Sequence, residues 1–96
     1  MRALLIALEF IDDPVAFERY RAEVIATLTP YQGKFLVRGG NAAVVEGDWP
    51  FERTVIVEFP SRQSAEAWYA SPAYQAILPL RLQSARCTTV IVDAVD

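Results

Sequence analysis

The chain has 96 residues, 53% of them hydrophobic and 22% charged, with a formal net charge of −3. This length suits one domain with a modest core, so we expect a single domain over residues 1–96. The basic residues are scattered and outnumbered by acidic ones, which argues against nucleic acid or an anionic membrane as a partner. The short apolar start lacks a small-residue cleavage site, and no run approaches a membrane span of about 18 residues. We therefore expect a cytoplasmic protein.

The first third of the chain predicts a strand followed by a helix. Residues 3–10 are apolar on both alternating sides, apart from Glu9, which is typical of a strand covered on both faces. Asp13 and Pro14 suit the N-cap and the first position of a helix. Apolar residues then recur at helical spacing until Pro30, where we expect the helix to end.

The middle of the chain predicts a long, glycine-broken β-hairpin. Its first strand is expected to run from Lys34 to about Glu46, with a bulge or bend at Gly39-Gly40. Residues 47–50 are rich in turn-forming types and predict the connecting loop. The stretch 53–59 is rich in valine, isoleucine and phenylalanine and predicts the returning strand.

The last third predicts two helical segments and a final strand. Ser61 suits the N-cap of a helix that buries Ala65, Trp68 and Tyr69. Ser71-Pro72 repeats the cap-and-proline signal and predicts a short helix, which Pro79 is expected to end or kink. Residues 88–95 predict the last strand.

The order β-α-β-β-α-β predicts an α+β, ferredoxin-like fold, in which a four-stranded antiparallel sheet carries both helices on one face. Nothing in the chain is left to cover the other face. The residues that we expect there are Leu5, Ala7, Leu36, Thr54, Ile56 and Ile91. Exposure of the larger ones forfeits about 1.5–3 kcal/mol each. We therefore expect a homodimer whose two sheets pack face to face about a two-fold axis.

Five short runs resemble a family in the same order along the chain. They are residues 33–40 (GKFLVRGG), 46–49 (EGDW), 58–61 (EFPS), 68–74 (WYASPAY) and 78–81 (LPLR). The sequence is similar to the domain-of-unknown-function family numbered thirteen-thirty. The resemblance implies a homodimeric α+β barrel made of two ferredoxin-like sheets. The wider superfamily includes cofactor-free monooxygenases, isomerases, haem-handling enzymes and small-ligand-binding proteins, so the fold by itself does not select an activity.

The residue types present exclude several kinds of chemistry. The chain has no histidine and one cysteine, Cys87, which removes the usual general base, haem ligand and tetrahedral zinc set. It also lacks a phosphate-binding glycine loop and a nucleophile elbow. We expect no metal and no cofactor, and we interpret Cys87 as a small buried residue in a reducing compartment.

Three charged residues interrupt the apolar strands. Glu9, Arg38 and Glu58 share the strand alternation of residues expected on the uncovered face, so we expect them to point toward the barrel interior. Glu9 and Arg38 should lie near one another, with Glu58 toward the opposite edge. The simplest interpretation is a structural ion pair or a solvated strand end. A functional interpretation makes Arg38 an anion clamp and Glu58 or Glu9 a proton shuttle.

These residues suggest a binding cleft between the sheet and the helices. Its expected ligand-binding residues are Arg38, Gly39, Gly40, Trp49, Tyr69 and Arg81. Trp49 has the alternative of simple loop packing, and Arg81 that of capping helix carbonyls.

We weigh three functions. The first is binding of a small, partly apolar metabolite that can carry a carboxylate. The second is a cofactor-independent isomerase or monooxygenase that uses a buried carboxylate as acid or base. The third is a non-catalytic dimeric assembly module.

Overall fold

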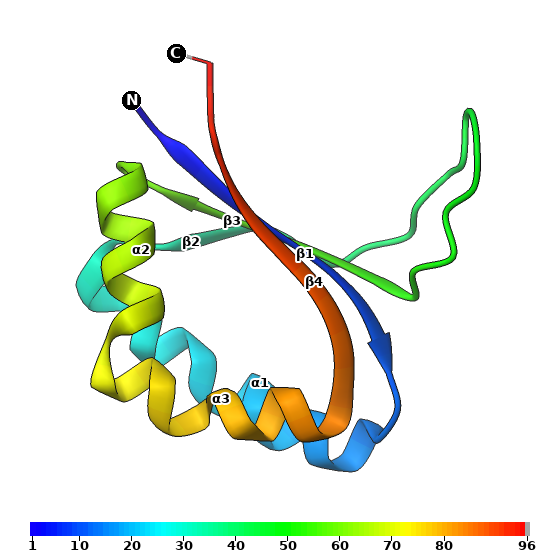
Figure 1. Ribbon diagram of the computed structural model, residues 1–96, viewed down its shortest axis with the longest axis horizontal. Helices are drawn as coiled ribbons and strands as arrows, with labels where there is room; N and C mark the ends of the chain where they lie inside the picture. Colours follow the sequence, from blue (N-terminus) through cyan, green and yellow to red (C-terminus); the bar gives the residue numbers. More distant parts are fainter. Residues whose placement is uncertain (96) are drawn as a thin grey trace.

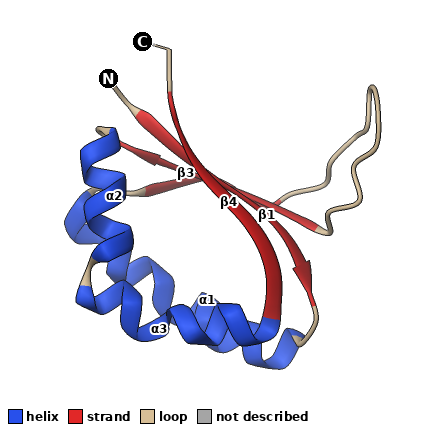
Figure 2. Cartoon of the chain, in the orientation of Figure 1, coloured by secondary structure: helices blue, strands red, loops and turns tan. Residues whose placement is uncertain are grey.

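The computed structural model describes residues 1–95, and their arrangement confirms the predicted order of elements. The elements are β1 (Ala3–Ile11), α1 (Pro14–Leu28), a 3-10 turn η1 (Thr29–Tyr31), β2 (Lys34–Gly39), β3 (Arg53–Phe59), α2 (Arg62–Ala70), α3 (Pro72–Ser84) and β4 (Ala85–Asp93). Within this range the strands form one antiparallel sheet in the order β2-β3-β1-β4. All three helices lie on one face of that sheet (Figure 1, Figure 2).

Short polar side chains begin each helix. Asp13 and Ser61 accept hydrogen bonds from the first turns of α1 and α2, as the sequence predicted. Ser71 separates α2 from α3: its hydroxyl donates to the Trp68 carbonyl at 2.7 Å and accepts the Tyr74 N–H at 3.2 Å. This one residue therefore sets the angle at which α3 returns toward β4.

The core lies between the helices and the inner face of the sheet. Ala3, Leu5 and Ala7 of β1 point inward and are at most 6% exposed. Beside them on β3, Val57 and Phe59 point the same way. The small alanines let α2 lie close to β1, so the covered face is the one with the smaller β1 side chains.

This arrangement corrects which sheet face is open. The expected alternation is right, but Leu5, Ala7 and Ile91 face the helices and not the uncovered side. The residues on the open face are Leu4, Ile6, Leu8, Val37, Thr54, Ile56, Val90 and Val92. Both faces of β1 are apolar, so hydrophobicity could not tell them apart. The open face is still a large apolar surface.

A bulge in β2 decides where Arg38 points. The pairing with β3 shifts between Phe35 and Val37, which leaves Leu36 in the bulge and 54% exposed. As a result Arg38 shares the helix-covered face with Phe35 and does not follow Leu36, as simple alternation predicted. The bulge therefore places the Arg38 side chain on the helix-covered face, whereas simple alternation would place it on the open face.

Several predicted boundaries are wrong. Strand β2 ends at Gly39, not near Glu46, because Gly39 and Gly40 have φ of +99° and +37°, which breaks the ladder. Residues 40–52, here named the arm, instead project away from the sheet (Figure 1). Helix α3 continues through Pro79 to Ser84, and β4 starts at Ala85. None of the described helices is long and apolar enough to cross a membrane.

Candidate functional site

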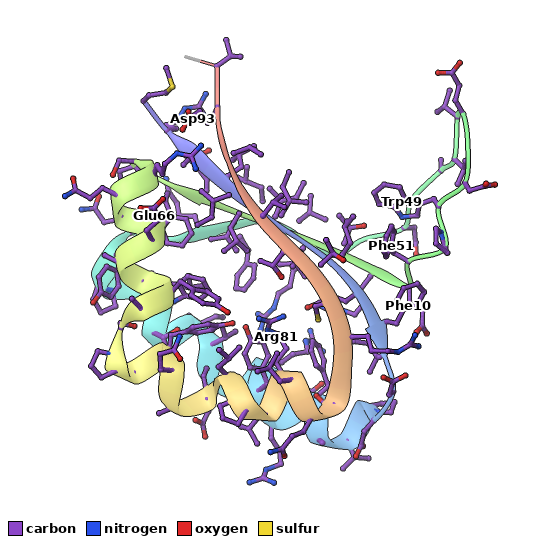
Figure 3. The ribbon with its side chains drawn as sticks, in the orientation of Figure 1. Phe10, Trp49, Phe51, Glu66, Arg81 and Asp93 are labelled. Atoms are coloured by element: carbon purple, nitrogen blue, oxygen red, sulfur yellow. The ribbon has the colours of Figure 1, made fainter. Side chains whose placement is uncertain are left out.

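A small cavity lies between the inner face of the sheet and the helices. Its volume is about 40 Å³, room for roughly three water molecules. The lining comes from β1, β2, β3, all three helices and one residue of β4. Figure 3 shows Arg81 reaching from α3 into the space between the helices and the sheet. We call this cavity and its mouth the cleft.

The cleft concentrates positive charge on an otherwise acidic chain. Among the described residues that line it are four arginines, Arg21, Arg38, Arg53 and Arg81, and one carboxylate, Glu9. The rest of the lining is mostly apolar or aromatic. The imbalance is local, because the whole chain has a net charge of −3.

Glu9 is neutralised within the protein. Its residue is 2% exposed, and Oε1 accepts a hydrogen bond from Arg53 Nε at 3.2 Å. The other oxygen, Oε2, lies 3.6 Å from Cys87 Sγ. Burial raises the pKa of the Cys87 thiol, so the thiol stays protonated and can donate to Glu9. The charge of Arg53 is therefore already matched.

Arg81 is bonded to a neutral hydroxyl instead. It lies in the last turn of α3 and is 5% exposed. Its Nε donates to the Tyr74 hydroxyl at 3.3 Å, and that hydroxyl is 2.9 Å from the Tyr20 hydroxyl. Burial raises the pKa of both tyrosines, which are neutral at physiological pH. Within residues 1–95, no carboxylate forms an ion pair with Arg81.

Arg38 is the second cation of the cleft without a carboxylate among the described residues. Its Nη2 donates to the Arg21 carbonyl at 3.0 Å, and its guanidinium lies 4.5 Å from the centre of the Phe35 ring. Burial and the charges of Arg21 and Arg53 lower the pKa of Arg38. Arg21 pairs outward with Glu18, yet its buried Nε has no hydrogen-bond partner in the described part of the chain.

The structure gathers some of the predicted site residues here and scatters the rest. Glu9, Arg38 and Arg81 all line the cleft. Gly39 ends β2 beside it and Gly40 begins the arm; a Cβ on Gly39 would meet the Arg53 guanidinium at 3.7 Å.

Three other predicted residues lie outside the cleft. Trp49 is on the arm, and Tyr69 is 38% exposed, against the prediction that it is buried. Glu58 is on the open face at the far end of the sheet, where it pairs with Arg2 at 3.1 Å. It does not approach Glu9 or Arg38.

Sequence reasoning missed the pairing role of Arg53 and the hydroxyl pair of Tyr20 and Tyr74. Arg53 faces Glu9 through strand register, which one strand's pattern cannot show. The sequence does indicate that Arg81 lies on the buried side of α3, because the i, i+3, i+4, i+7 spacing joins it to Tyr74, Ile77 and Leu78. A cation on the apolar stripe of a helix is unusual.

The fold and sheet order define an α+β, ferredoxin-like protein. The chain belongs to the family described as "Domain of unknown function (DUF1330)", which matches residues 2–95. The family resemblance read from the sequence is thereby confirmed. No curated protein matches the chain. Within residues 1–95 no three Cys, Asp or Glu side chains gather as a metal site.

Solved structures with low identity share the fold. A protein of unknown function from Rhodopseudomonas palustris is 16% identical, with a TM-score of 0.79 over 99% of this chain and 83% of its own. A dimeric ferredoxin-like protein of unknown function from Jannaschia is 13% identical, with a TM-score of 0.77 over 98% and 100%. A cofactor-independent oxygenase from Streptomyces nogalater is 10% identical, with a TM-score of 0.68 over 99% and 94%.

Proposed function

We propose that this protein binds a small, partly apolar carboxylate in the cleft. The observation that carries the proposal is the buried Arg81 guanidinium, which donates to the neutral Tyr74 hydroxyl and forms no ion pair with a carboxylate of the described residues. A buried charge without a counter-charge costs several kcal/mol. An anionic ligand would supply the missing charge, so the cost is offset when the ligand is bound.

The chemistry of the lining supports a carboxylate with an apolar body. A guanidinium fork matches a planar carboxylate through two parallel hydrogen bonds. The apolar surface around the charged groups comes from Phe17, Val24, Leu28, Phe35 and Trp68. A phosphate would favour a cradle of backbone N–H groups, whereas the polar groups of this lining are mostly arginine and tyrosine side chains.

The small volume implies that the cleft widens on binding. Exposure rises from Arg81, through Arg53, whose side chain is 18% exposed, to Arg21 at 35%. The mouth therefore lies near Arg21 and Arg38, with Arg81 at the base. Rotation of the half-buried Arg38 away from Phe35 would open the mouth and leave its guanidinium free for a ligand.

A homodimer is part of the proposal. Two solved neighbours are described as dimeric, and the open face of this sheet carries exposed apolar residues such as Val90 and Val92. A second copy would cover that face.

We further place the protein in the cytoplasm, since a single unpaired cysteine suits a reducing compartment.

Calorimetric titration tests the binding proposal with benzoate, hexanoate and the neutral isostere benzamide. We expect a carboxylate to bind at least about tenfold more tightly than benzamide. Arg38→Ala and Arg81→Met should each weaken carboxylate binding about tenfold or more. Arg19→Gln, a change at an exposed arginine of α1, is the matched control and should bind as wild type does. Equal binding of benzamide, no binding of either carboxylate, or unchanged affinity in both cleft variants would contradict the proposal.

A second candidate is a cofactor-independent enzyme, favoured by the buried carboxylate of Glu9 in the same cleft. One structural neighbour is described as a cofactor-independent oxygenase. Glu58 is the weaker acid or base candidate, because it lies on the open face in an exposed ion pair. Turnover of a phenol, quinol or lactone substrate that is lost in Glu9→Gln would favour this candidate. Absence of turnover across that panel would favour binding alone.

A further inference from the structure

The arm, residues 40–52, is the most exposed apolar segment of the described chain. Val45 is 91% exposed, Val44 56% and Trp49 41%. Figure 1 shows the arm rising from the sheet on the side away from the helices. Residues 42–46 and Trp49 border an open hollow of about 430 Å³ on its inner side. Large apolar side chains left in water favour a partner that covers them.

The base of the arm is fixed to the sheet. Glu52 accepts the Ile11 N–H through Oε1 at 3.0 Å, and its own N–H donates to the Glu9 carbonyl at 3.0 Å. Both bonds join the arm to β1. The arm therefore leaves the sheet in a defined direction.

An aromatic ladder connects the arm to the open face. The rings of Trp49 and Phe51 lie 5.3 Å apart, and those of Phe51 and Phe10 lie 5.3 Å apart. Figure 3 shows the three residues following one another from the end of β1 up the arm. Phe10 continues the row of Leu4, Ile6 and Leu8 along β1, so the apolar surface passes from the sheet onto the arm without a break.

The reach of the arm fits a second sheet placed on the open face. A chain that runs out for about six residues and returns can extend about 20 Å. Two packed sheets lie about 10 Å apart. An arm that rises on the open side must therefore pass alongside a second copy seated there.

We infer that the arm clasps the second copy, with Val44, Val45 and Trp49 as its contact residues. This inference rests on the proposed homodimer and not on the proposed ligand. In a two-fold dimer each copy contributes one arm, so the apolar hollow inside each arm receives side chains of the other copy.

Sedimentation velocity over a concentration series tests the clasp. The variants are Val45→Asp and a short arm in which residues 42–48 are replaced by two glycines. Val15→Asp is the matched control, because Val15 is 81% exposed on α1, far from the arm in sequence and on the helix-covered side. We expect both arm variants to raise the dimer Kd at least tenfold and Val15→Asp to change it less than twofold. Circular dichroism checks that each variant is folded.

The outcomes separate the clasp from the dimer. A dimeric wild type with unchanged Kd in the short-arm variant overturns the clasp and leaves the dimer standing. A wild type that sediments as one subunit up to 100 µM overturns both. An equal loss of dimer in Val15→Asp would also overturn the clasp, since the effect would then not be specific to the arm.

Discussion

Arg81 is the buried residue on which the proposed binding site depends. It occupies the apolar stripe of α3, where a leucine or methionine would pack without a charge to satisfy. The Tyr74 hydroxyl accepts a hydrogen bond from Arg81 and also hydrogen-bonds with the Tyr20 hydroxyl, so each tyrosine hydroxyl keeps a partner when Arg81 is replaced. A residue that weakens the fold yet lines a cavity is typical of a binding site.

We therefore expect Arg81→Met to stabilise the protein while it weakens carboxylate binding. Removal of an uncompensated buried charge should raise the free energy of unfolding by about 1–2 kcal/mol. Urea denaturation measures this change. A loss of stability of similar size would contradict the account, because it would show that Arg81 is a structural residue.

Two glutamates offer a matched comparison of buried and exposed ion pairs. In the Glu9–Arg53 pair the side chains are 3% and 18% exposed, whereas those of Glu58 and Arg2 are 20% and 48% exposed. Glu9→Gln should lower the free energy of unfolding by about 3 kcal/mol, and Glu58→Gln by less than about 1 kcal/mol. Chemical denaturation of the two variants measures both values. Equal losses would mean that Glu9 is not held as a buried charge.

The buried hydroxyls predict a fall in stability at alkaline pH. Tyrosine in an unfolded chain ionises near pH 10, whereas burial raises the pKa of Tyr20 and Tyr74 above that value. Above pH 10 the folded chain therefore binds more protons than the unfolded chain. The free energy of unfolding should fall as pH rises, by up to about 1.4 kcal/mol per pH unit for each tyrosine.

Urea denaturation at pH 9, 10 and 11 measures this dependence. Tyr20→Phe should reduce the slope by about a third, since it removes one of the three groups, Tyr20, Tyr74 and Cys87, whose pKa burial raises. If wild type and Tyr20→Phe lose stability equally between pH 10 and 11, the hydroxyls are not protected by burial.

At the level of elements, the sequence predicted the caps and the alternation well, because both are local. Asp13, Ser61 and Ser71 begin helices as expected. The errors have non-local causes. Helix α3 continues through Pro79 because tertiary packing of Ile77 and Leu78 on either side of the proline holds it. The bulge at Leu36, which turns Arg38 inward, depends on pairing with β3.

At the scale of elements, we predict how removal of the Ser71 hydroxyl changes stability. Its buried hydroxyl ends α2 and begins α3, so Ser71→Ala should lower the free energy of unfolding by about 1–2 kcal/mol. The half-buried Ser61 cap site is less suitable as a test, because water has more access to its bond. Thermal denaturation of Ser71→Ala measures the loss. An unchanged Tm would show that the turn is held by packing of Trp68 and Tyr74 alone.

At the scale of the whole molecule, we propose that one face of the sheet serves ligand binding and the other serves dimer formation. The inner face and the helices enclose an arginine-lined cleft, and the open face with the arm receives a second copy. The excess of apolar strand residues was visible in the sequence and predicted a covering partner. The positive charge of the cleft could not be predicted from the sequence, because its arginines come from four different elements. They are Arg21, Arg38, Arg53 and Arg81. Their meeting depends on sheet order, helix placement and one bulge.

Native mass spectrometry of protein purified under gentle conditions tests the central claim, that the cleft holds a small carboxylate. Wild type should appear as two subunits that retain a small acidic molecule, and Arg81→Met should appear as two subunits without it. If wild type carries no such molecule even with millimolar benzoate present, or if Arg81→Met retains the same one, the claim is contradicted.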